Sequence, residues 1–189
     1  MTSQVAVAES ILLDTTVFYH FAGAGCMSHL KAYLGGRARV TQEVRREIWV
    51  AQDCGYLQDA TLTAMPLWPK KTGHIPEASQ MDFLRLRELA QEEEAHLRGL
   101  PDVVKAERHS GEVSTVLMAQ CRHDDLVVID DGYGRKLALR RDLTCLKTAE
   151  LVVQLAKEGA LSENDALRSY NQAASMTLGI SQFRALLTR

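Results

Sequence analysis

The chain lacks the short patterns that would assign its chemistry at once. It has no CxxC pair, no GxxxxGK[ST] loop, no GxSxG turn and no HExxH helix, which argues against a zinc knuckle, a P-loop, a serine hydrolase and a zinc peptidase. Gly23-x-Gly25 and Gly132-x-Gly134 each miss the third glycine of a dinucleotide-binding loop. The six histidines are scattered, and we expect each to be a surface or structural residue.

Neither sign of charge dominates the sequence. It has 22 Lys and Arg residues against 24 Asp and Glu residues, a formal net charge of −2. A chain without a net positive field is not drawn to nucleic acid as a whole. Any contact with RNA or DNA therefore has to be local, or bridged by metal ions.

Hydrophobic runs long enough to cross a membrane are also missing, because the run at Ile11–Leu13 is interrupted at once by Asp14. The stretch from Met1 to Ser10 has no cationic start and contains Glu9, unlike a secretory signal. The four cysteines are scattered, which suits a reducing compartment. We therefore expect a soluble, cytoplasmic protein with no membrane contact.

The residues that are present predict an α/β domain. Of the 189 residues, 46% are hydrophobic, which is enough to bury a core. Continuous aliphatic runs at 11–13 and 126–129 predict strands buried on both faces, and shorter strands are expected at 38–40 and 143–146. Helical segments alternate with these strands, which implies a mostly parallel central sheet with helices on both faces.

A boundary is expected near the end of the helix that begins at Thr148, because Gly159 closes it. Ser162-x-x-Asp165 then resembles a capping box that begins another helix. We expect residues 1–160 to form the main domain and residues 161–189 to form a C-terminal helical extension.

Acidic residues directly follow both of the long apolar runs. Asp14 comes after the first run, and Asp130 and Asp131 come after the second. In parallel sheets, ligands bind beyond the carboxyl ends of the strands. These carboxylates therefore lie close together if the two strands are neighbours. Taken singly, each acid has an equally good interpretation as a turn former.

Glutamates near the starts of two helices add to this set. Ser110 is expected to cap a helix from Gly111, which places Glu112 in the first turn. The alternative for Glu112 is a favourable interaction with the helix dipole alone.

Thr41 is expected to cap a helix that runs to about Trp49, with Glu43 and Glu47 on one face beside its buried stripe. The alternative for both glutamates is an exposed surface position.

A cluster of three or more carboxylates has a definite chemistry. Such groups repel one another, and at least one stays protonated unless a cation neutralises them. Oxygen ligands suit Mg²⁺ or Mn²⁺ better than zinc. A divalent ion held in this way activates water and stabilises the charge that develops on a phosphodiester.

The first two acidic segments resemble those of the PIN-domain nucleases. Residues 11–17 (ILLDTTV) resemble the opening strand of that family, with its first acid and a following hydroxyl residue. Residues 40–48 (VTQEVRREI) resemble the second segment, in which the glutamate near the end is the site acid. By this resemblance Glu47, rather than Glu43, belongs to the site.

The remaining two segments follow in the order of the same family. Gly111-Glu112 is similar to the start of its third acidic helix. Residues 126–131, followed by 135–138 (RKLA), resemble the strand, acid pair and helix of a toxin-related subgroup of prokaryotic PIN proteins.

The resemblance covers about residues 9–160. It implies a three-layer α/β/α fold and metal-dependent cleavage of single-stranded RNA. Many prokaryotic members are toxins of type II toxin–antitoxin pairs, held inactive by a small antitoxin protein, and many form homodimers. The chain departs from compact toxin members in the long segment at about 50–80 and in residues 161–189, which extend past the usual end.

We therefore hypothesise an endoribonuclease that uses Mg²⁺ or Mn²⁺. The expected catalytic and metal-binding residues are Asp14, Glu47, Glu112 and Asp131. Asp130 is expected to be a further metal ligand or to support the ligands. Thr15 and Thr16 are expected to hydrogen-bond a carboxylate or a bound water.

Basic residues flank the acids in the sequence. Those expected to contact nucleic acid are Arg45, Arg46, Arg135 and Lys136, with Arg140 and Arg141 nearby. Singly, each is better explained as a solvated side chain, but the set would give a local, salt-sensitive contact. Two other interpretations stay open: a catalytically inactive PIN-like module that binds RNA or protein, and an α/β interaction protein with no nucleic-acid role.

Overall fold

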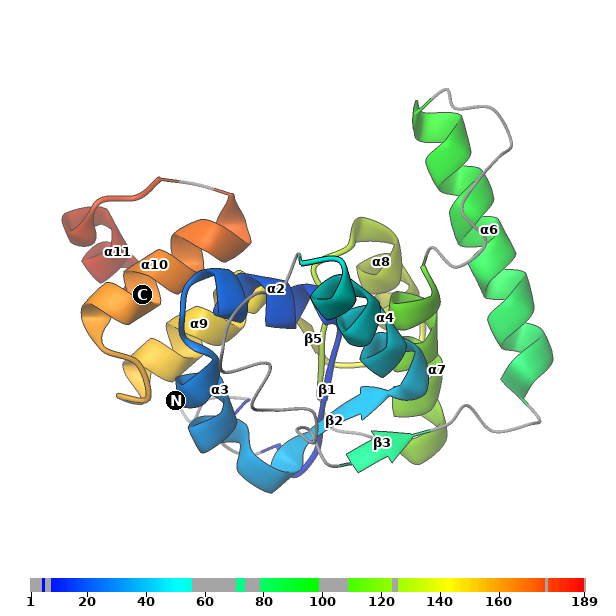
Figure 1. Ribbon diagram of the computed structural model, residues 1–189, viewed down its shortest axis with the longest axis horizontal. Coiled ribbons are helices and arrows are strands. Elements are labelled where there is room, and N and C mark those ends of the chain that lie inside the picture. The colour runs from blue at the N-terminus through cyan, green and yellow to red at the C-terminus, as the bar shows by residue number, and fades with distance from the viewer. Residues whose placement is uncertain are drawn as a thin grey trace.

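The computed structural model describes residues 5, 8–55, 71–73, 79–98, 109–123, 126–175 and 177–188. Within these ranges the strands form a five-stranded, all-parallel sheet in the order β3-β2-β1-β4-β5 (Figure 1). The strands are β1 (Ile11–Leu13), β2 (Ala38–Thr41), β3 (Lys71–Gly73), β4 (Leu126–Val128) and β5 (Cys145–Leu146). The predicted parallel α/β fold is confirmed.

Helices connect these strands and cover the sheet. They are α2 (Thr15–Gly23), α3 (Met27–Leu34), α4 (Gln42–Asp53), α6 (Gln80–Arg98), α7 (Ser110–Arg122), α8 (Gly132–Arg140), α9 (Thr148–Lys157), α10 (Glu163–Ala174) and α11 (Ile180–Leu187), with a 3-10 turn, η1, at Gly35–Arg37. Figure 1 shows α6 standing out from the rest of the molecule. Its first turns still pack on the core, through Phe83 and Leu86.

The central strand β1 buries alternate side chains on opposite faces of the sheet, which produces three layers. Ile11 and Leu13 pack in a core with buried residues of α2, α3 and α9. Leu12 faces the other way and packs with α7 and α8. All three side chains are fully buried, so the unbroken apolar run reflects a strand covered on both sides.

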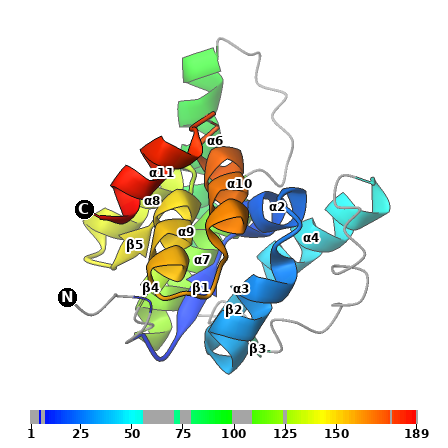
Figure 2. The ribbon, with the colours of Figure 1, turned by 90° about the vertical axis from the view of Figure 1, so that its left-hand side faces the viewer.

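The C-terminal helices pack on the first of these two faces. Ala166 of α10 and Phe183 of α11 are fully buried and belong to the same core as Ile11. Figure 2 shows α10 beside α9 and next to α2, which agrees with the contacts between these helices. The extension therefore packs on the helical layer formed by α2 and α9. None of the helices in the described ranges is both long and apolar enough to cross a bilayer.

Two elements were not predicted from the sequence. α2 begins directly after β1, where Asp14 caps it, and β3 pairs with β2 at the sheet edge. The cap of α7 also differs, because His109 occupies the N-cap and Ser110 is the first helical residue. Residues 56–70 and 74–78 of the long segment lie outside the described residues.

Candidate metal centre

The first acid sits where β1 meets its neighbour β4. The backbone N–H of Asp14 donates to the carbonyl of Val128 over 3.1 Å, which ties the two strand ends together. Its carboxylate Oδ2 caps α2, accepting from the Thr16 N–H at 3.4 Å and from the Thr16 hydroxyl at 2.8 Å. The side chain is 1% exposed. Its other oxygen, Oδ1, is buried and accepts no hydrogen bond from any described residue.

Glu47 reaches the same place from α4. Its carboxylate accepts hydrogen bonds from the Thr15 hydroxyl, next to Asp14, and from the Gly111 N–H, at 3.0 Å. A Cβ at Gly111 would lie 2.6 Å from Glu47 Oε2, closer than real Cβ contacts allow. Glycine at this position therefore lets the start of α7 approach the carboxylate.

A buried pair of hydroxyls fixes α4 against α7. Thr41 Oγ1 caps α4 by accepting from the Val44 N–H at 3.2 Å, as its position in the sequence predicted. The same hydroxyl lies 2.7 Å from Ser114 Oγ, which donates to the carbonyl of Gly111 at 2.8 Å. These contacts hold the helix that carries Glu47 beside the helix that carries Glu112.

Glu112 stands among the other acids. Its pKa is raised to about 9, mainly by burial and then by the charges of Asp14, Glu47 and Asp131. The helix α8 passes close to it, since a Cβ at Gly134 would lie 3.0 Å from Glu112 Cβ. Asp14 and Asp131 thus have a common neighbour, although they lie 117 positions apart in the chain (131 − 14 = 117).

Asp14 and Glu47 also have raised pKa values. Burial raises the pKa of Asp14 to about 6, against the hydrogen bonds from Thr16 that lower it. Burial also raises the pKa of Glu47 to about 7, with a further contribution from the charge of Asp14. Raised pKa values for three neighbouring carboxyls mean that holding them all ionised is unfavourable without a cation.

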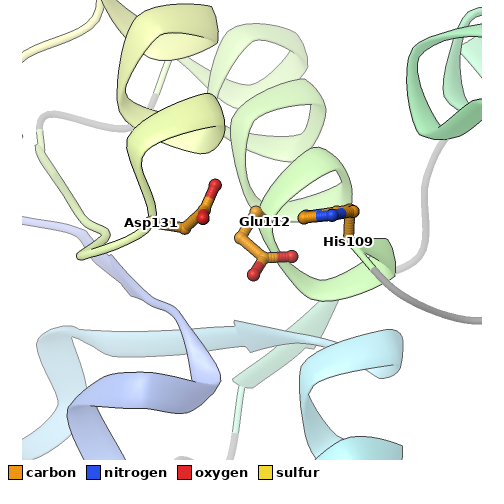
Figure 3. A group of neighbouring side chains, drawn as sticks. All are labelled: His109, Glu112 and Asp131. Carbon is orange, nitrogen blue, oxygen red and sulfur yellow. The ribbon is translucent and has the colours of Figure 1, made fainter. Parts of the chain in front are cut away.

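Asp131 completes the group from the loop after β4. Its Oδ1 accepts from the N–H groups of Tyr133 and Gly134, at 2.8 and 2.9 Å, and so caps α8. Ligand atoms of Asp131, Glu112 and His109 all lie within 4.8 Å of one another. Figure 3 shows these side chains around the start of α7, with the His109 ring directed toward Glu112.

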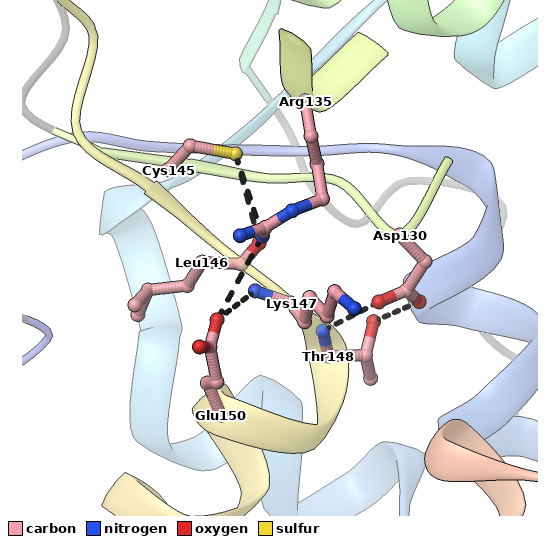
Figure 4. A network of polar contacts seen from close by, with 7 residues as sticks. All are labelled: Asp130, Arg135, Cys145, Leu146, Lys147, Thr148 and Glu150. Atoms are coloured by element: carbon pink, nitrogen blue, oxygen red, sulfur yellow. Dashed lines mark hydrogen bonds and ion pairs between the residues drawn. The ribbon is translucent and has the colours of Figure 1, made fainter. Parts of the chain in front are cut away.

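The neighbouring Asp130 has a different environment. Its Oδ1 accepts from the Thr148 N–H at 2.8 Å, and its Oδ2 accepts from the Thr148 hydroxyl at 2.6 Å. His20 Nε2 lies 3.2 Å from Oδ2. Burial opposes ionisation of Asp130, but the hydrogen bonds from His20 and Thr148 outweigh it and hold the pKa of this carboxyl below its usual value. Figure 4 shows the Thr148 contacts.

The basic residues singled out from the sequence fall into two groups. Arg135 Nη1 lies 3.9 Å from Cys145 Sγ and 3.7 Å from Glu150 Oε2 (Figure 4). Arg135 therefore forms an ion pair with Glu150. Arg46 and Lys136 are exposed and Arg45 is half-buried.

The residues at this edge fit a hard divalent cation. Asp14 Oδ1 is a buried oxygen that accepts no hydrogen bond from the described residues. Around it are carboxyls whose ionised form would be stabilised by positive charge. Carboxylate oxygens are ligands that suit both Mg²⁺ and Mn²⁺.

The structure brings together the acids that the sequence singled out: Asp14, Glu47, Glu112 and Asp131. Thr15 and Thr16 both donate to carboxylates of this group. His109 also lies in this group, although the sequence favoured a surface or structural interpretation for each histidine. Its spacing of three residues before Glu112, at a helix start, was the available signal.

Comparison with known proteins gives a match between residues 10–173 and the model of a family described as a PIN domain. The matched region contains every acid of the centre and ends within α10. No curated protein and no solved structure matches the chain.

Proposed function

The chain belongs to the PIN-domain family, and from that premise we propose that it is a divalent-metal-dependent endoribonuclease that hydrolyses single-stranded RNA. The observation that carries the proposal is the meeting of Asp14, Glu47, Glu112 and Asp131 from four separate elements. These acids lie beyond the carboxyl ends of β1 and β4, where parallel sheets bind their ligands.

Asp14, Glu112 and Asp131 are the residues that we propose to hold Mg²⁺ or Mn²⁺. A bound ion would supply a polarised water and a counter-charge for the phosphodiester. Asp14 offers its unpartnered Oδ1, and Asp131 offers the oxygen that does not cap α8. Glu47 is placed to hold or accept a proton at its carboxylate, because burial raises its pKa to about 7.

Asp130 is proposed to support this centre without binding the ion. Both of its oxygens already accept hydrogen bonds from Thr148. Thr148 is the first residue of α9, so the contact fixes the chain that leads directly into Asp131. Of the two roles left open for Asp130 by the sequence, its hydrogen bonds favour support.

Exposed basic residues beside the acids are proposed to bind the RNA backbone. Arg46 lies next to Glu47 in α4, and Lys136 lies on α8, the helix that Asp131 caps. Lysine and arginine contacts to phosphate weaken as salt rises, so RNA binding should be salt-sensitive. Arg135, which is half-buried and lies 3.7 Å from Glu150, is a further candidate from the same helix.

Toxin activity, inhibition by a small antitoxin protein and homodimer formation are finer proposals that rest on the family resemblance. They are tested by expression in a bacterial host and by light scattering on the purified chain. Growth arrest by the wild type, absent with Asp14→Asn, would support the toxin role. A cytoplasmic location agrees with the four cysteines, all of them free thiols within the described residues.

The direct test is hydrolysis of a labelled single-stranded RNA in Mn²⁺ by the wild type and by Asp14→Asn. We expect cleavage by the wild type that stops on chelation and is absent in the variant. Asparagine keeps a carbonyl oxygen for capping α2, so a folded but inactive variant is the expected result. Equal, chelator-resistant cleavage by both proteins would refute the proposal, and Mn²⁺ binding without cleavage of RNA or DNA would favour an inactive binding module.

A further inference from the structure

His109 holds a backbone conformation that points its ring at the acids. It caps α7 with φ 62° and ψ 7°, in the left-handed region. Few residues other than glycine adopt this region, although histidine is among those enriched in it. The Tyr133 ring lies 6.2 Å from the His109 ring, tilted by 55°. The imidazole is therefore close to an aromatic ring, and it is directed toward Glu112 (Figure 3).

The separation of these groups matches a shared ion. Ligand atoms of His109, Glu112 and Asp131 lie within 4.8 Å of one another. Two ligands on opposite sides of a small divalent ion are about 4 Å apart, given bond lengths near 2.1 Å. Small side-chain rotations would bring all three groups onto one ion.

Asp14 gives an independent sign that a cation belongs here. Its Oδ1 is buried and accepts no hydrogen bond from the described residues. It lies close enough to Glu112 for its charge to raise the pKa of that residue. A buried acceptor without a donor, facing the same glutamate as His109, is unfavourable unless something positive fills the space.

We propose that His109 is a nitrogen ligand of the ion held by Glu112 and Asp131, and that it makes the centre prefer Mn²⁺ to Mg²⁺. This inference rests on the proposed metal-dependent function and adds a ligand and a metal preference to it. Mg²⁺ favours oxygen ligands, whereas imidazole suits the transition metals. An imidazole ligand would increase the preference for Mn²⁺ over that of a centre of oxygens alone.

The test uses Mn²⁺ alone as the probe, bound to the full chain and measured by electron spin-echo spectroscopy, which detects nitrogen bonded to the ion. His109→Asn removes the imidazole, and asparagine tolerates a left-handed backbone. His123→Asn is the matched control, because His123 caps the other end of α7, also in the left-handed region (φ 53°). Nitrogen coupling should appear in the wild type and His123→Asn and be absent in His109→Asn.

A second readout is the ratio of Mn²⁺ to Mg²⁺ affinity, measured by calorimetric titration of the same three proteins. Loss of a residue that merely supports a ligand already costs about 10- to 100-fold in metal affinity. We therefore expect the ratio to fall at least about tenfold in His109→Asn and to stay constant in His123→Asn.

Three results overturn the inference in distinguishable ways. Bound Mn²⁺ without nitrogen coupling, or coupling that survives in His109→Asn, removes His109 as a ligand and leaves the proposed nuclease function standing. If the wild type binds no Mn²⁺, both the role of His109 and the proposed metal-dependent function are refuted. An equal loss of affinity for Mn²⁺ and Mg²⁺ in His109→Asn would refute the metal preference.

Discussion

Two adjacent aspartates at the end of β4 occupy opposite environments. Asp130 is saturated by hydrogen bonds from Thr148 and paired with His20, and its pKa is lowered. Asp131 faces Glu112, and the acids around Glu112 have raised pKa values. Both oxygens of Asp130 accept hydrogen bonds from Thr148, whereas the hydrogen bonds to Asp131 from the start of α8 go to Oδ1 alone.

We infer from this difference a structural role for Asp130 and a metal-binding role for Asp131. A buried carboxylate that the fold fully satisfies strengthens the native state. A group of carboxylates that the fold leaves unsatisfied weakens the native state until a cation binds. Substitutions in the two environments should therefore have opposite effects on stability and on metal binding.

The largest effect is expected from Asp14→Asn. Loss of a ligand should reduce RNA cleavage by more than about 100-fold and abolish the rise in melting temperature with Mn²⁺. The metal-free variant should be as stable as the wild type at pH 8 or more so, because a buried charge is removed. Thermal unfolding with and without Mn²⁺ checks this, and a Mn²⁺-induced rise equal to that of the wild type would contradict it.

The second-largest loss of activity is expected from Gly111→Ala. A Cβ there would lie 2.6 Å from Glu47 Oε2, so the carboxylate has to leave its hydrogen bond with the helix start. We expect cleavage to fall about 10- to 100-fold, measured as initial rates in Mn²⁺. Gly36→Ala is the control, since no atom lies within 4 Å of a Cβ at that position; an equal loss in both variants would mean that the close approach to Glu47 is irrelevant.

In contrast to Asp14→Asn, Asp130→Asn should lower the stability of the protein and leave metal binding intact. It weakens charge-assisted hydrogen bonds to Thr148, at a cost of about 1–3 kcal/mol. For a chain of this size that corresponds to a fall in melting temperature of roughly 3–9 °C. The rise in melting temperature on adding Mn²⁺ should persist. If that rise disappears in a folded variant, Asp130 is a ligand after all.

The last prediction concerns the pH dependence of stability. The pKa values of Asp14, Glu47 and Glu112 are raised on folding to about 6, 7 and 9, so the metal-free native state binds more protons than the unfolded chain above about pH 4. Stability should then decrease as pH rises from about 5 to 9. Asp130 acts in the opposite sense, because its lowered pKa contributes stability that is lost only in acid.

Calorimetry across this range, with and without Mn²⁺, measures both contributions. Mn²⁺ should reduce the decrease at high pH, because it binds the ionised carboxylates. A metal-free melting temperature that increases steadily from pH 5 to 9 would refute this account of the cluster.

The sequence contained enough information for the sheet, because its central strands are buried on both faces. The runs at 11–13 and 126–129 are unbroken for that reason, and each ends in an acid. By contrast, the helix α2 begins without a connecting loop directly after β1. The edge strand β3 lacks an apolar run, so no periodicity marked either element.

The sequence indicated which acids lie at the centre, but not which hydrogen-bond donors each acid would have. Asp130 and Asp131 are identical and adjacent in the sequence, and only their donors, Thr148 and the start of α8, distinguish them. The sequence pattern did not indicate His109. Its position beside Glu112 depends on a left-handed backbone conformation, in which the ring is directed toward Glu112. Such properties depend on tertiary contacts that a single sequence does not display.

Anomalous diffraction from a crystal soaked in Mn²⁺ tests the central claim most directly. The account predicts a strong peak within coordination distance of carboxylate oxygens from Asp14, Glu112 and Asp131, with Asp130 still bonded to Thr148. A peak at Asp130 with none beside Asp14, or no peak at this edge of the sheet, would contradict it.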